Sequence, residues 1–441
     1  MLDLMQNTLI LGKGISGYAA KNLLEKRNKK YIIVDESDNT LQSFQNLCKN
    51  ENFSHCVISP GFSNNHPWLK FVKSINLNVL TEFELGWSEL KGKTIAITGS
   101  NGKSTALKIL YETFLLAGLK VSIGGNYGIP TSQLAVEKND IDWYLLEISS
   151  FQLENITNFK PHISILLNVY PNHLDRHNSF DEYMKIKFKI LTQNSCDNSL
   201  NIFPYRLTNE ILVHTSDLNN CLTFGIEEKA DYKFKNGFIF AKDYSPFCIQ
   251  DTFLDKINLC ETTAPALLAV INHCDIDPNI FLACIKTFKG LKHRISSLGF
   301  TNNIEFVNDS KSTNMTAMIN AVRNFKSKNS IKLIAGGVLK EKNITFVKEI
   351  LAECNVTLYA YGKSASCLCD SWGDRIPFIK CSCLRSALFK AYDDATIGDI
   401  VLLSPGCSSY DQFTSYIERG NYFEELVDEI RLVNEGEKNE E

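Results

Sequence analysis

The sequence predicts an α/β protein made of three domains, each a mostly parallel sheet with flanking helices. Its 441 residues exceed what one ordinary hydrophobic core organises. Short apolar runs alternate with longer stretches of helical spacing, which is the pattern of parallel strands joined by helical crossovers. Many of the apolar runs end in turns rich in Gly, Ser, Pro or Asn. Open α/β sheets bind ligands at this carboxyl edge, so we expect binding sites there.

Composition and charge restrict the class of protein. With 44% hydrophobic and 22% charged residues and a formal net charge of -4, the chain has the composition of a soluble globular protein without a basic surface. We therefore expect no nucleic acid and no membrane as partners. No apolar run approaches the ~18 residues of a membrane span, and no secretion signal is evident in residues 1–8. The fourteen cysteines lack the spacing of a small disulfide scaffold, which indicates reduced thiols and a cytoplasmic location.

The first nucleotide signal lies near the N-terminus. A strand at residues 8–11 runs into Gly12-Lys13-Gly14-Ile15-Ser16-Gly17, a helix covers 18–26, and a strand at 31–34 ends at Asp35. Three spaced glycines followed by an acidic residue are typical of dinucleotide binding. Two other readings stay open: glycines that only allow tight packing, and a mononucleotide such as a uridine diphosphate group at the helix N-terminus. We favour the mononucleotide, because a stronger phosphate loop follows later in the chain.

A further strand at residues 55–59 ends in Ser59-Pro60-Gly61. A turn at this position lies at the ligand-binding edge of the sheet. We therefore expect Ser59 to belong to the same site.

The stronger signal is a phosphate-binding loop. A strand at residues 93–98 leads into Gly99-Ser100-Asn101-Gly102-Lys103-Ser104-Thr105, and a helix is expected over 105–117. Glycines let the backbone aim N–H groups at phosphate oxygens, a lysine supplies positive charge, and a serine hydroxyl can ligate magnesium. Ile97 stands where a standard Walker loop has glycine, so this loop is of a tighter type. The segment predicts a nucleoside triphosphate site.

Metal-binding candidates follow on the next strands. Glu147 ends a strand at residues 143–148 and can complete the magnesium shell begun by Ser104. His173 follows a strand at 163–169. It has three readings: a transition-metal site with Asp175 and His177, a polar loop, or a ligand of a second hard metal ion. We prefer the third, because the loop faces the phosphate site.

The last segment repeats the α/β pattern after residue 290, with strands expected at 304–307, 331–334, 356–360 and 400–403. Asn308-Asp309-Ser310-Lys311-Ser312-Thr313-Asn314 follows the first of these and suits a substrate carboxylate. The turns at 336–340 and 404–409 also end strands, and together they outline a site. The tail at 434–441 is rich in Glu, Asn and Lys and is expected to be disordered.

A zinc site is a weaker alternative in this segment. Cys367 and Cys369 are followed by Cys381 and Cys383. Four thiolates could hold zinc, but each pair straddles one residue, which favours buried same-face positions of strands.

These signals divide the chain into three predicted domains. Residues 1–91 form a Rossmann-like domain for a uridine nucleotide, residues 92–290 a P-loop-type ATP-binding domain, and residues 291–441 a Rossmann-like domain for a small substrate.

The motifs resemble those of the Mur ligases nearly end to end. The matching blocks are residues 98–105, 125–128, 147–154, 168–176 and 308–314. The last block differs in sister ligases and in folylpolyglutamate synthetases. The resemblance therefore implies an ATP- and magnesium-dependent ligase of peptidoglycan precursor synthesis. It would join D-glutamate to UDP-N-acetylmuramoyl-L-alanine through an acyl phosphate, as a cytoplasmic monomer that serves cell-wall growth and division.

The resemblance also implies roles for single residues. ATP would contact Gly99, Ser100, Asn101, Gly102, Lys103, Ser104, Thr105, Arg294 and Asp309. The metal ligands would be Ser104, Glu147, His173 and Lys187, with Lys103, His173 and Lys187 catalytic. The uridine substrate would meet Ile15, Ser16, Asp35, Ser59 and Asn126. D-glutamate would meet Lys311, Thr313, Lys340, Ser409 and Tyr416.

Three points stay open. The family carries a carbamylated lysine, for which Lys187 matches best and Lys185 remains an alternative. The asparagines that the family carries near residues 261–265 are absent, and the setting of Lys340 departs from the family pattern. The alternative functions are a sister ligase, a folylpolyglutamate synthetase-like ligase and a non-catalytic nucleotide-binding homologue.

Overall fold

The computed structural model describes residues 7–137, 140–173, 176–192, 199–214, 220–257, 259–326, 328, 330–341 and 343–438. The chain forms two compact units. The first comprises Met1–Val169, Asp181–Leu254 and Leu259–Thr287, and the second Tyr170–Phe180, Asp255–Asn258 and Phe288–Glu441. Within the described residues the strands form three mostly parallel sheets with flanking helices, which confirms the predicted fold class.

The smaller sheet of the first unit is entirely parallel, in the order β2-β1-β3-β4. Its strands are β1 (Asn7–Leu11), β2 (Tyr31–Val34), β3 (Phe53–Ile58) and β4 (Asn78–Thr81). The accompanying helices are α1 (Ile15–Lys26), α2 (Leu41–Asn50), α3 (Pro67–Ser74) and α4 (Glu82–Trp87).

The larger sheet of the first unit has the order β13-β12-β11-β10-β9-β8-β5-β7-β6. Its strands are β5 (Lys93–Thr98), β6 (Val121–Gly125), β7 (Trp143–Glu147), β8 (Ile163–Leu166), β9 (Leu200–Pro204), β10 (Cys221–Gly225), β11 (Tyr232–Lys235), β12 (Phe238–Ala241) and β13 (Phe247–Cys248). Its helices are α5 (Lys103–Leu116), α6 (Thr131–Glu137), α7 (Ser150–Leu153), α8 (Phe180–Thr192), the 3-10 turn η1 (Tyr205–Leu207), α9 (Thr208–His214), α10 (Phe253–Lys256), α11 (Thr263–His273) and α12 (Pro278–Thr287).

The sheet of the second unit has the order β14-β15-β19-β16-β17-β18. Its strands are β14 (Ser296–Thr301), β15 (Ile304–Asn308), β16 (Ile331–Gly336), β17 (Val356–Tyr361), β18 (Phe378–Lys380) and β19 (Ile400–Leu403). Its helices are α13 (Met315–Asn324), the 3-10 turn η2 (Thr345–Val347), α14 (Lys348–Glu353), α15 (Ala365–Trp372), α16 (Leu384–Asp393) and α17 (Tyr416–Lys438).

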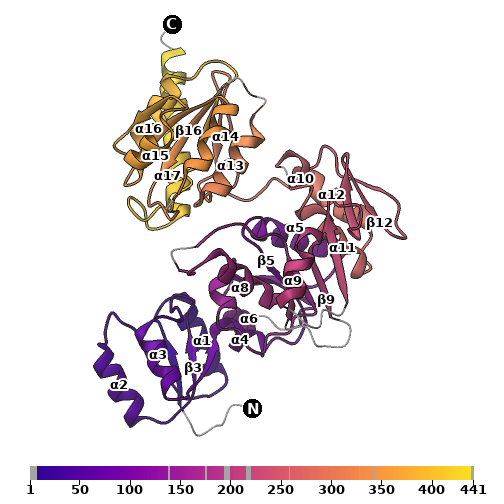
Figure 1. Cartoon of the computed structure of the whole chain (residues 1–441), viewed down its shortest axis with the longest axis vertical. Helices are drawn as coiled ribbons and strands as arrows, with labels where there is room; N and C mark the ends of the chain where they lie inside the picture. The colour runs from indigo at the N-terminus through magenta and orange to yellow at the C-terminus, as the bar shows by residue number, and fades with distance from the viewer. Residues whose placement is uncertain are drawn as a thin grey trace. The chain divides into compact units, whose positions relative to one another are not determined.

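Helices cover both faces of the second unit's sheet, and Figure 1 shows β16 between α16 on one side and α13 and α14 on the other. The two faces bury separate apolar clusters. Leu333 and Leu358 pack with α13, α14 and α15, whereas Ile334 and Tyr359 pack with α16 and α17. Alternation of side chains along each strand produces this division.

Strand order places the predicted loops together. In the larger sheet of the first unit, β8, β5, β7 and β6 are parallel neighbours. In the second unit, β19 lies between β15 and β16, and all three are parallel. Parallel neighbours end at one edge of a sheet, so their carboxyl-terminal loops converge.

The structure corrects several local expectations. The helix predicted from residue 105 begins at Lys103, so Lys103 and Ser104 belong to its first turn. Residues 434–438, expected to be disordered, continue α17, while 439–441 lie outside the described residues. The hairpins β11–β13 and the antiparallel strand β14 were not predicted. Among the described helices, none is both long and apolar enough to cross a membrane.

The two sheets of the first unit share an apolar core. Leu23 and Leu24 of α1 cluster with Leu85 of α4 and Ala135 of α6. The approach of α4 to α6 requires glycine, because a Cβ added to Gly86 would lie 2.1 Å from the backbone nitrogen of Ser132. This contact packs α4 of the smaller sheet directly against α6 of the larger sheet.

Replacing Gly86 with alanine is therefore expected to destabilise the first unit. Overpacking against backbone atoms costs about 1–3 kcal/mol, which exceeds the gain of up to about 1 kcal/mol in helix propensity. Urea unfolding measures the change in free energy. Gly14→Ala is the matched control, since an added Cβ there meets no atom within 4 Å. Equal stability of the two variants would contradict the assigned packing.

Candidate active site

The phosphate-binding loop connects β5 to α5. Gly102 at the helix N-cap has φ 82°, a left-handed conformation that glycine adopts without strain. Gly102 has no side chain that could cap this helix N-terminus. The first N–H groups of a helix have no partner within it and carry partial positive charge. The loop therefore forms a cradle for an anion such as a phosphate group.

Asn168, which follows β8, holds the backbone of this loop. Its Oδ1 accepts hydrogen bonds from the N–H groups of Ser100 (3.1 Å) and Asn101 (3.0 Å), and its Nδ2 donates to the Asn101 carbonyl (3.1 Å). The Ser100 hydroxyl also lies 2.9 Å from the Tyr183 hydroxyl on α8. The sequence analysis did not assign this role to Asn168. Its position directly after a buried strand was the available signal.

Lys103 and Lys187 both reach the loop. The Lys103 Nζ donates to the carbonyls of Gly99 (2.7 Å) and Ser100 (3.2 Å). The Lys187 Nζ donates to the Gly99 carbonyl (2.9 Å) and the Thr98 hydroxyl (3.1 Å). Lys187 is 1% exposed. Burial, reinforced by the nearby charge of Lys103, holds the pKa of Lys187 well below its usual value, and Glu147 opposes this shift.

The three lysines of α8 occupy different environments. Lys185 forms a surface ion pair with Asp181 at 2.7 Å. Lys189 donates to the Glu154 carbonyl at 2.7 Å. Lys187 contacts the phosphate loop, which favours it over the surface-paired Lys185 for the predicted carbamylated position.

Glu147 lies at the carboxyl end of β7 with two polar partners. The Ser104 hydroxyl donates to one oxygen of the carboxylate, and the Asn126 Nδ2 donates to the other at 2.7 Å. Glu147 and Ser104 are 3% and 2% exposed, so water does not surround them. A carboxylate beside a hydroxyl at a phosphate loop is a donor set that fits magnesium, which prefers oxygen ligands.

The loop after β1 was predicted to meet the uridine nucleotide. Gly12 has φ 102°, and a Cβ there would lie 2.7 Å from the Ser59 hydroxyl. Asp35 accepts hydrogen bonds from the backbone N–H groups of Lys13 (2.8 Å) and Ser37 (3.0 Å), which lower its pKa. Ile15 is 80% exposed at the start of α1. Asp35 thus shapes the glycine-rich loop.

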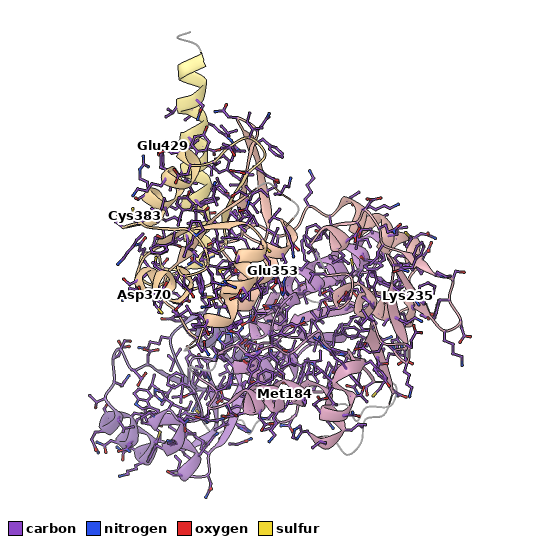
Figure 2. All side chains as sticks on the ribbon, turned by 45° about the horizontal axis from the view of Figure 1, so that its top comes forward. Met184, Lys235, Glu353, Asp370, Cys383 and Glu429 are labelled. Carbon is purple, nitrogen blue, oxygen red and sulfur yellow. The ribbon has the colours of Figure 1, made fainter. Side chains whose placement is uncertain are left out.

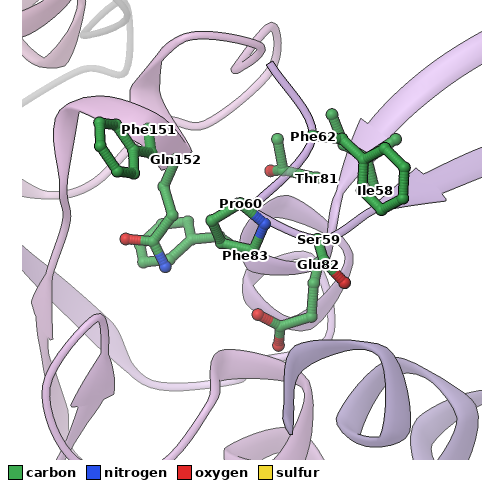
Figure 3. Close-up of a pocket in the computed structure, with 9 residues that line it drawn as sticks. All are labelled: Ile58, Ser59, Pro60, Phe62, Thr81, Glu82, Phe83, Phe151 and Gln152. Atoms are coloured by element: carbon green, nitrogen blue, oxygen red, sulfur yellow. The ribbon is translucent and has the colours of Figure 1, made fainter. Parts of the chain in front are cut away.

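A small hollow lies beside this loop (Figure 3). The turn after β3, the start of α4 and α7 line it with Ile58, Ser59, Pro60, Phe62, Thr81, Glu82, Phe83, Phe151 and Gln152. The Ser59 hydroxyl is buried and has no hydrogen-bond partner among the described residues. Burial raises the pKa of Glu82 to about 7, against a hydrogen bond from the Ser132 N–H at 2.7 Å. The hollow can therefore accept a polar ligand group at Ser59.

In the second unit, the predicted substrate residues gather on adjoining loops. The Lys311 Nζ lies 3.8 Å from the centre of the Tyr416 ring, which is cation–π geometry. Val338 and Ser408 exchange backbone hydrogen bonds of 2.8 and 3.0 Å, which tie the loop of Lys340 to that of Ser409. Thr313, half-buried, precedes Asn314, whose side chain caps α13.

Asp309 is buried in the same unit. The Ser404 hydroxyl donates to it at 2.8 Å and the Ile295 N–H at 3.2 Å. Burial raises the pKa of Asp309 to about 7, and these hydrogen bonds and the charges of Arg294 and Arg419 oppose the rise. Asp309 is thus first of all an anchor for the chain near Arg294.

His173 belongs to the segment Tyr170–Phe180, which is grouped with the second unit. Its backbone is left-handed, with φ 55°, and its N–H donates to the Asn172 side chain at 2.9 Å. Asp175 lies outside the described residues. The roles of His173, Arg294 and Asp309 toward the nucleotide stay predictions.

Two further expectations concern metal and nucleotide contacts. Cys367 and Cys369 lie in α15 and not in a strand, and among the described residues no group of three or more His, Cys, Asp or Glu side chains could hold a metal ion.

Thr263, in the segment without the expected asparagines, is fully buried beside Gly102. Its hydroxyl has no hydrogen-bond partner in the described part of the chain.

Comparison with known proteins identifies the family. Residues 97–259 match the model of the Mur ligase middle domain. A protein of Buchnera aphidicola subsp. Baizongia pistaciae, named UDP-N-acetylmuramoylalanine--D-glutamate ligase, is 32% identical over 97% of this chain and 98% of its own. A relative of the same name from Lawsonia intracellularis is 32% identical over 96% of this chain and 94% of its own. The chain belongs to the Mur ligase family, among the UDP-N-acetylmuramoylalanine--D-glutamate ligases.

Solved structures share the fold of this chain. MurF ligase from Thermotoga maritima, in complex with ADP, aligns with a TM-score of 0.60 at 17% identity, covering 88% of this chain and 92% of that one. A bifunctional folylpolyglutamate synthase/dihydrofolate synthase from Yersinia pestis aligns with a TM-score of 0.61 at 15% identity, covering 77% and 91%. The resemblance and the class of enzyme, a ligase of peptidoglycan precursor synthesis, are confirmed. The sister-ligase and folate alternatives are not favoured, because the full-length relatives carry the D-glutamate ligase name.

The contacts of Asn168 give the site a testable feature in this Mur ligase. Asn168→Ala removes three hydrogen bonds to the phosphate loop, and we expect the KM for ATP to rise about 10–100-fold because a misplaced loop loses its phosphate contacts. Steady-state kinetics measure this change. Asn201→Ala, which removes a buried amide of β9 instead, is the control. An unchanged KM for ATP in Asn168→Ala would exclude the role.

Proposed function

We propose that this Mur ligase uses ATP and magnesium to join D-glutamate to UDP-N-acetylmuramoyl-L-alanine, with release of ADP and phosphate. The observation that carries the proposal is the phosphate loop together with Ser104, Glu147 and the buried Lys187 in a member of this family. We further propose that residues 1–91 bind the uridine nucleotide, 92–290 bind ATP and 291–441 bind D-glutamate. The residues that would bind metal and phosphate are all present, which argues against a non-catalytic homologue.

The reaction requires activation of a carboxylate, which is a poor electrophile. Its oxygen attacks the γ-phosphorus of ATP, the bond to ADP breaks, and an acyl phosphate forms. The amine of D-glutamate then attacks the carbonyl carbon, the bond to phosphate breaks, and the amine loses a proton as the amide forms. Two anions must therefore be brought together, and positive charge is needed where they meet.

The residues of the phosphate loop supply that charge. Gly99, Ser100, Asn101, Gly102 and Thr105 are proposed to surround the phosphates, and Lys103 supplies a cation. Asn168 already accepts hydrogen bonds from the N–H groups of Ser100 and Asn101, so the N–H groups of the first turn of α5 are proposed to bind the phosphate oxygens. Ser104 and Glu147 would hold magnesium, which offsets the negative charge of the phosphates when bound. Arg294 and Asp309 are proposed to reach the nucleotide from residues 291–441.

Lys187 is proposed to carry a carbamate that helps His173 to hold a second metal ion. A neutral amine attacks carbon dioxide and loses a proton, so the modification needs a lysine whose pKa is lowered. Burial of Lys187 next to Lys103 supports such a lysine. The modification would place an anionic carbamate at the phosphate loop.

The remaining residues are proposed to bind the two substrates that are joined. Ile15, Ser16, Asp35 and Ser59 would contact the uridine nucleotide, and Asn126 would contact the muramoyl group. Ile15 is exposed and the Ser59 hydroxyl has no partner among the described residues, and both observations support a uridine-nucleotide site at these residues. Lys311, Thr313, Lys340, Ser409 and Tyr416 would surround D-glutamate, whose carboxylates fit a cation and hydroxyl groups.

We also propose a cytoplasmic monomer that serves cell-wall growth and division. The described cysteines are free thiols, as a reducing compartment favours. The monomer is the expectation of the family resemblance.

The function is tested by phosphate release from ATP with UDP-N-acetylmuramoyl-L-alanine and one amino-acid acceptor. We expect release and amide product with D-glutamate, and neither with L-glutamate, L-lysine or D-alanyl-D-alanine. Turnover with another acceptor would move the protein to a sister ligase. Nucleotide binding without turnover of any acceptor would favour a non-catalytic protein.

Carbamylation is tested with carbon-13 bicarbonate. We expect a carbamate resonance in the wild type that is lost in Lys187→Met and kept in Lys185→Met. Loss of a group that only supports a metal ligand typically costs about 10–100-fold, so loss of a ligand in Lys187→Met should lower activity by at least that factor. A resonance that disappears only in Lys185→Met would assign the modification to the other lysine.

A further inference from the structure

Arg419 is a buried cation that the sequence analysis did not select. It lies in the first turn of α17 and is fully buried. Its Nε donates to the Ser310 hydroxyl (3.0 Å) and its Nη2 to the Ser310 carbonyl (2.7 Å). Its Nη1 donates to the carbonyl of Cys407 (3.1 Å) and, more weakly, to that of Gly336 (3.5 Å). One guanidinium thus contacts the loops that follow β15 and β19 and the last residue of β16.

A buried charge of this kind needs partners for its N–H groups. Taking a guanidinium out of water is costly unless hydrogen bonds replace its hydration. Here the partners are loop oxygens, and the planar, rigid fork of arginine fixes their relative positions. Lysine has a rounder, more flexible ammonium group and cannot bridge the same set of oxygens.

The first of these loops joins Arg419 to two predicted contacts of D-glutamate. Ser310, which receives two of the hydrogen bonds, precedes Lys311. Its hydroxyl donates to the Tyr416 carbonyl at 2.8 Å, and the Lys311 Nζ lies over the Tyr416 ring. A shift of Ser310 would therefore move both side chains.

The other two loops are tied to each other as well as to Arg419. Gly337 has φ 131°, and a Cβ there would lie 2.2 Å from the Ser408 carbonyl, so the loops approach as closely as backbone allows. Val338 and Ser408 pair through their backbones. Lys340 follows Val338 on one loop, and Ser409 follows Ser408 on the other. Arg419 binds the carbonyls of Gly336 and Cys407, which lie just before this backbone pair.

We propose that Arg419 is a positioning residue for D-glutamate. It acts through Ser310, Cys407 and Gly336, whose loops carry the side chains that bind this substrate. The inference rests on the proposed function, and it adds a residue of α17 that touches no substrate. Loss of the guanidinium would loosen the cations and hydroxyl groups around D-glutamate while the phosphate loop of the first unit stays as it is.

The test compares Arg419→Lys and Arg419→Ala with the wild type. We expect the KM for D-glutamate to rise about 10–100-fold, the cost of a binding group misplaced by about 1 Å. The KM values for ATP and for UDP-N-acetylmuramoyl-L-alanine should stay near those of the wild type. Added guanidinium chloride at millimolar concentration should lower the KM for D-glutamate in Arg419→Ala, because it restores the missing donors.

Arg385→Ala is the matched control. Arg385 of α16 forms an ion pair with Glu429 of α17, and both side chains are more than 40% exposed. Figure 2 labels Glu429. Exposed pairs contribute little, so this variant should keep the wild-type KM for D-glutamate. Ser310→Ala is the second variant if Arg419 substitutions do not fold. It removes one acceptor of Arg419 and should raise the same KM, and by a smaller factor.

Two results would overturn the inference. One is a fall in the active fraction of enzyme with an unchanged KM for D-glutamate, which a purely structural arginine would give. The other is an equal rise of all three KM values. A wild type that does not turn over D-glutamate would reject the proposed function and the inference together, whereas an active wild type with either result rejects the inference alone.

Discussion

The phosphate loop depends on hydrogen bonds made to its backbone by two side chains behind it. Asn168 fixes the N–H groups of Ser100 and Asn101, and Lys187 binds the Gly99 carbonyl. A loop backbone can direct its N–H groups at phosphate only if other groups satisfy the rest of its polar atoms. Asn168 follows β8 and Lys187 lies on α8, so the larger sheet and one helix together fix the conformation on which Lys103, Ser104 and Glu147 rely.

In the second unit a buried polar side chain also fixes the backbone of strand ends, but this side chain is an arginine. There a buried guanidinium binds carbonyl oxygens at three strand ends, and the side chains proposed to bind substrate follow on the adjoining loops. In both units a polar group excluded from water sets the geometry, while the groups proposed to meet substrate lie one or two residues away. Buried polar groups with fully satisfied hydrogen bonds make such loops rigid, because any shift leaves a donor or acceptor unpaired.

The departure from the family near Glu261 has a local structural counterpart. Thr263 stands beside Gly102 at the N-terminus of α5, where its hydroxyl is buried and has no partner among the described residues. A hydroxyl at this place is shorter than an amide side chain and offers one donor instead of two.

The two sheets of the first unit pack together through α4 and α6. Gly86 lets α4 lie directly against the start of α6, and Glu82 accepts a hydrogen bond from the N–H of Ser132.

The sequence by itself determined the α/β class, the position of the phosphate loop, the strand ends that carry polar residues and the family. These are local properties: apolar periodicity, glycine spacing and motif order can be read along the chain. Only the tertiary structure decided four further points. Lys187 and not Lys185 lies at the loop, and Asn168 holds that loop. Asp35 shapes the glycine-rich loop after β1, and Arg419 joins three strand ends. Each of these depends on which strands are neighbours and on which side of a helix is buried, and residues up to 109 positions apart meet in this way. Sequence spacing carries no direct record of such contacts, since burial and hydrogen bonding are set by the packing of whole elements.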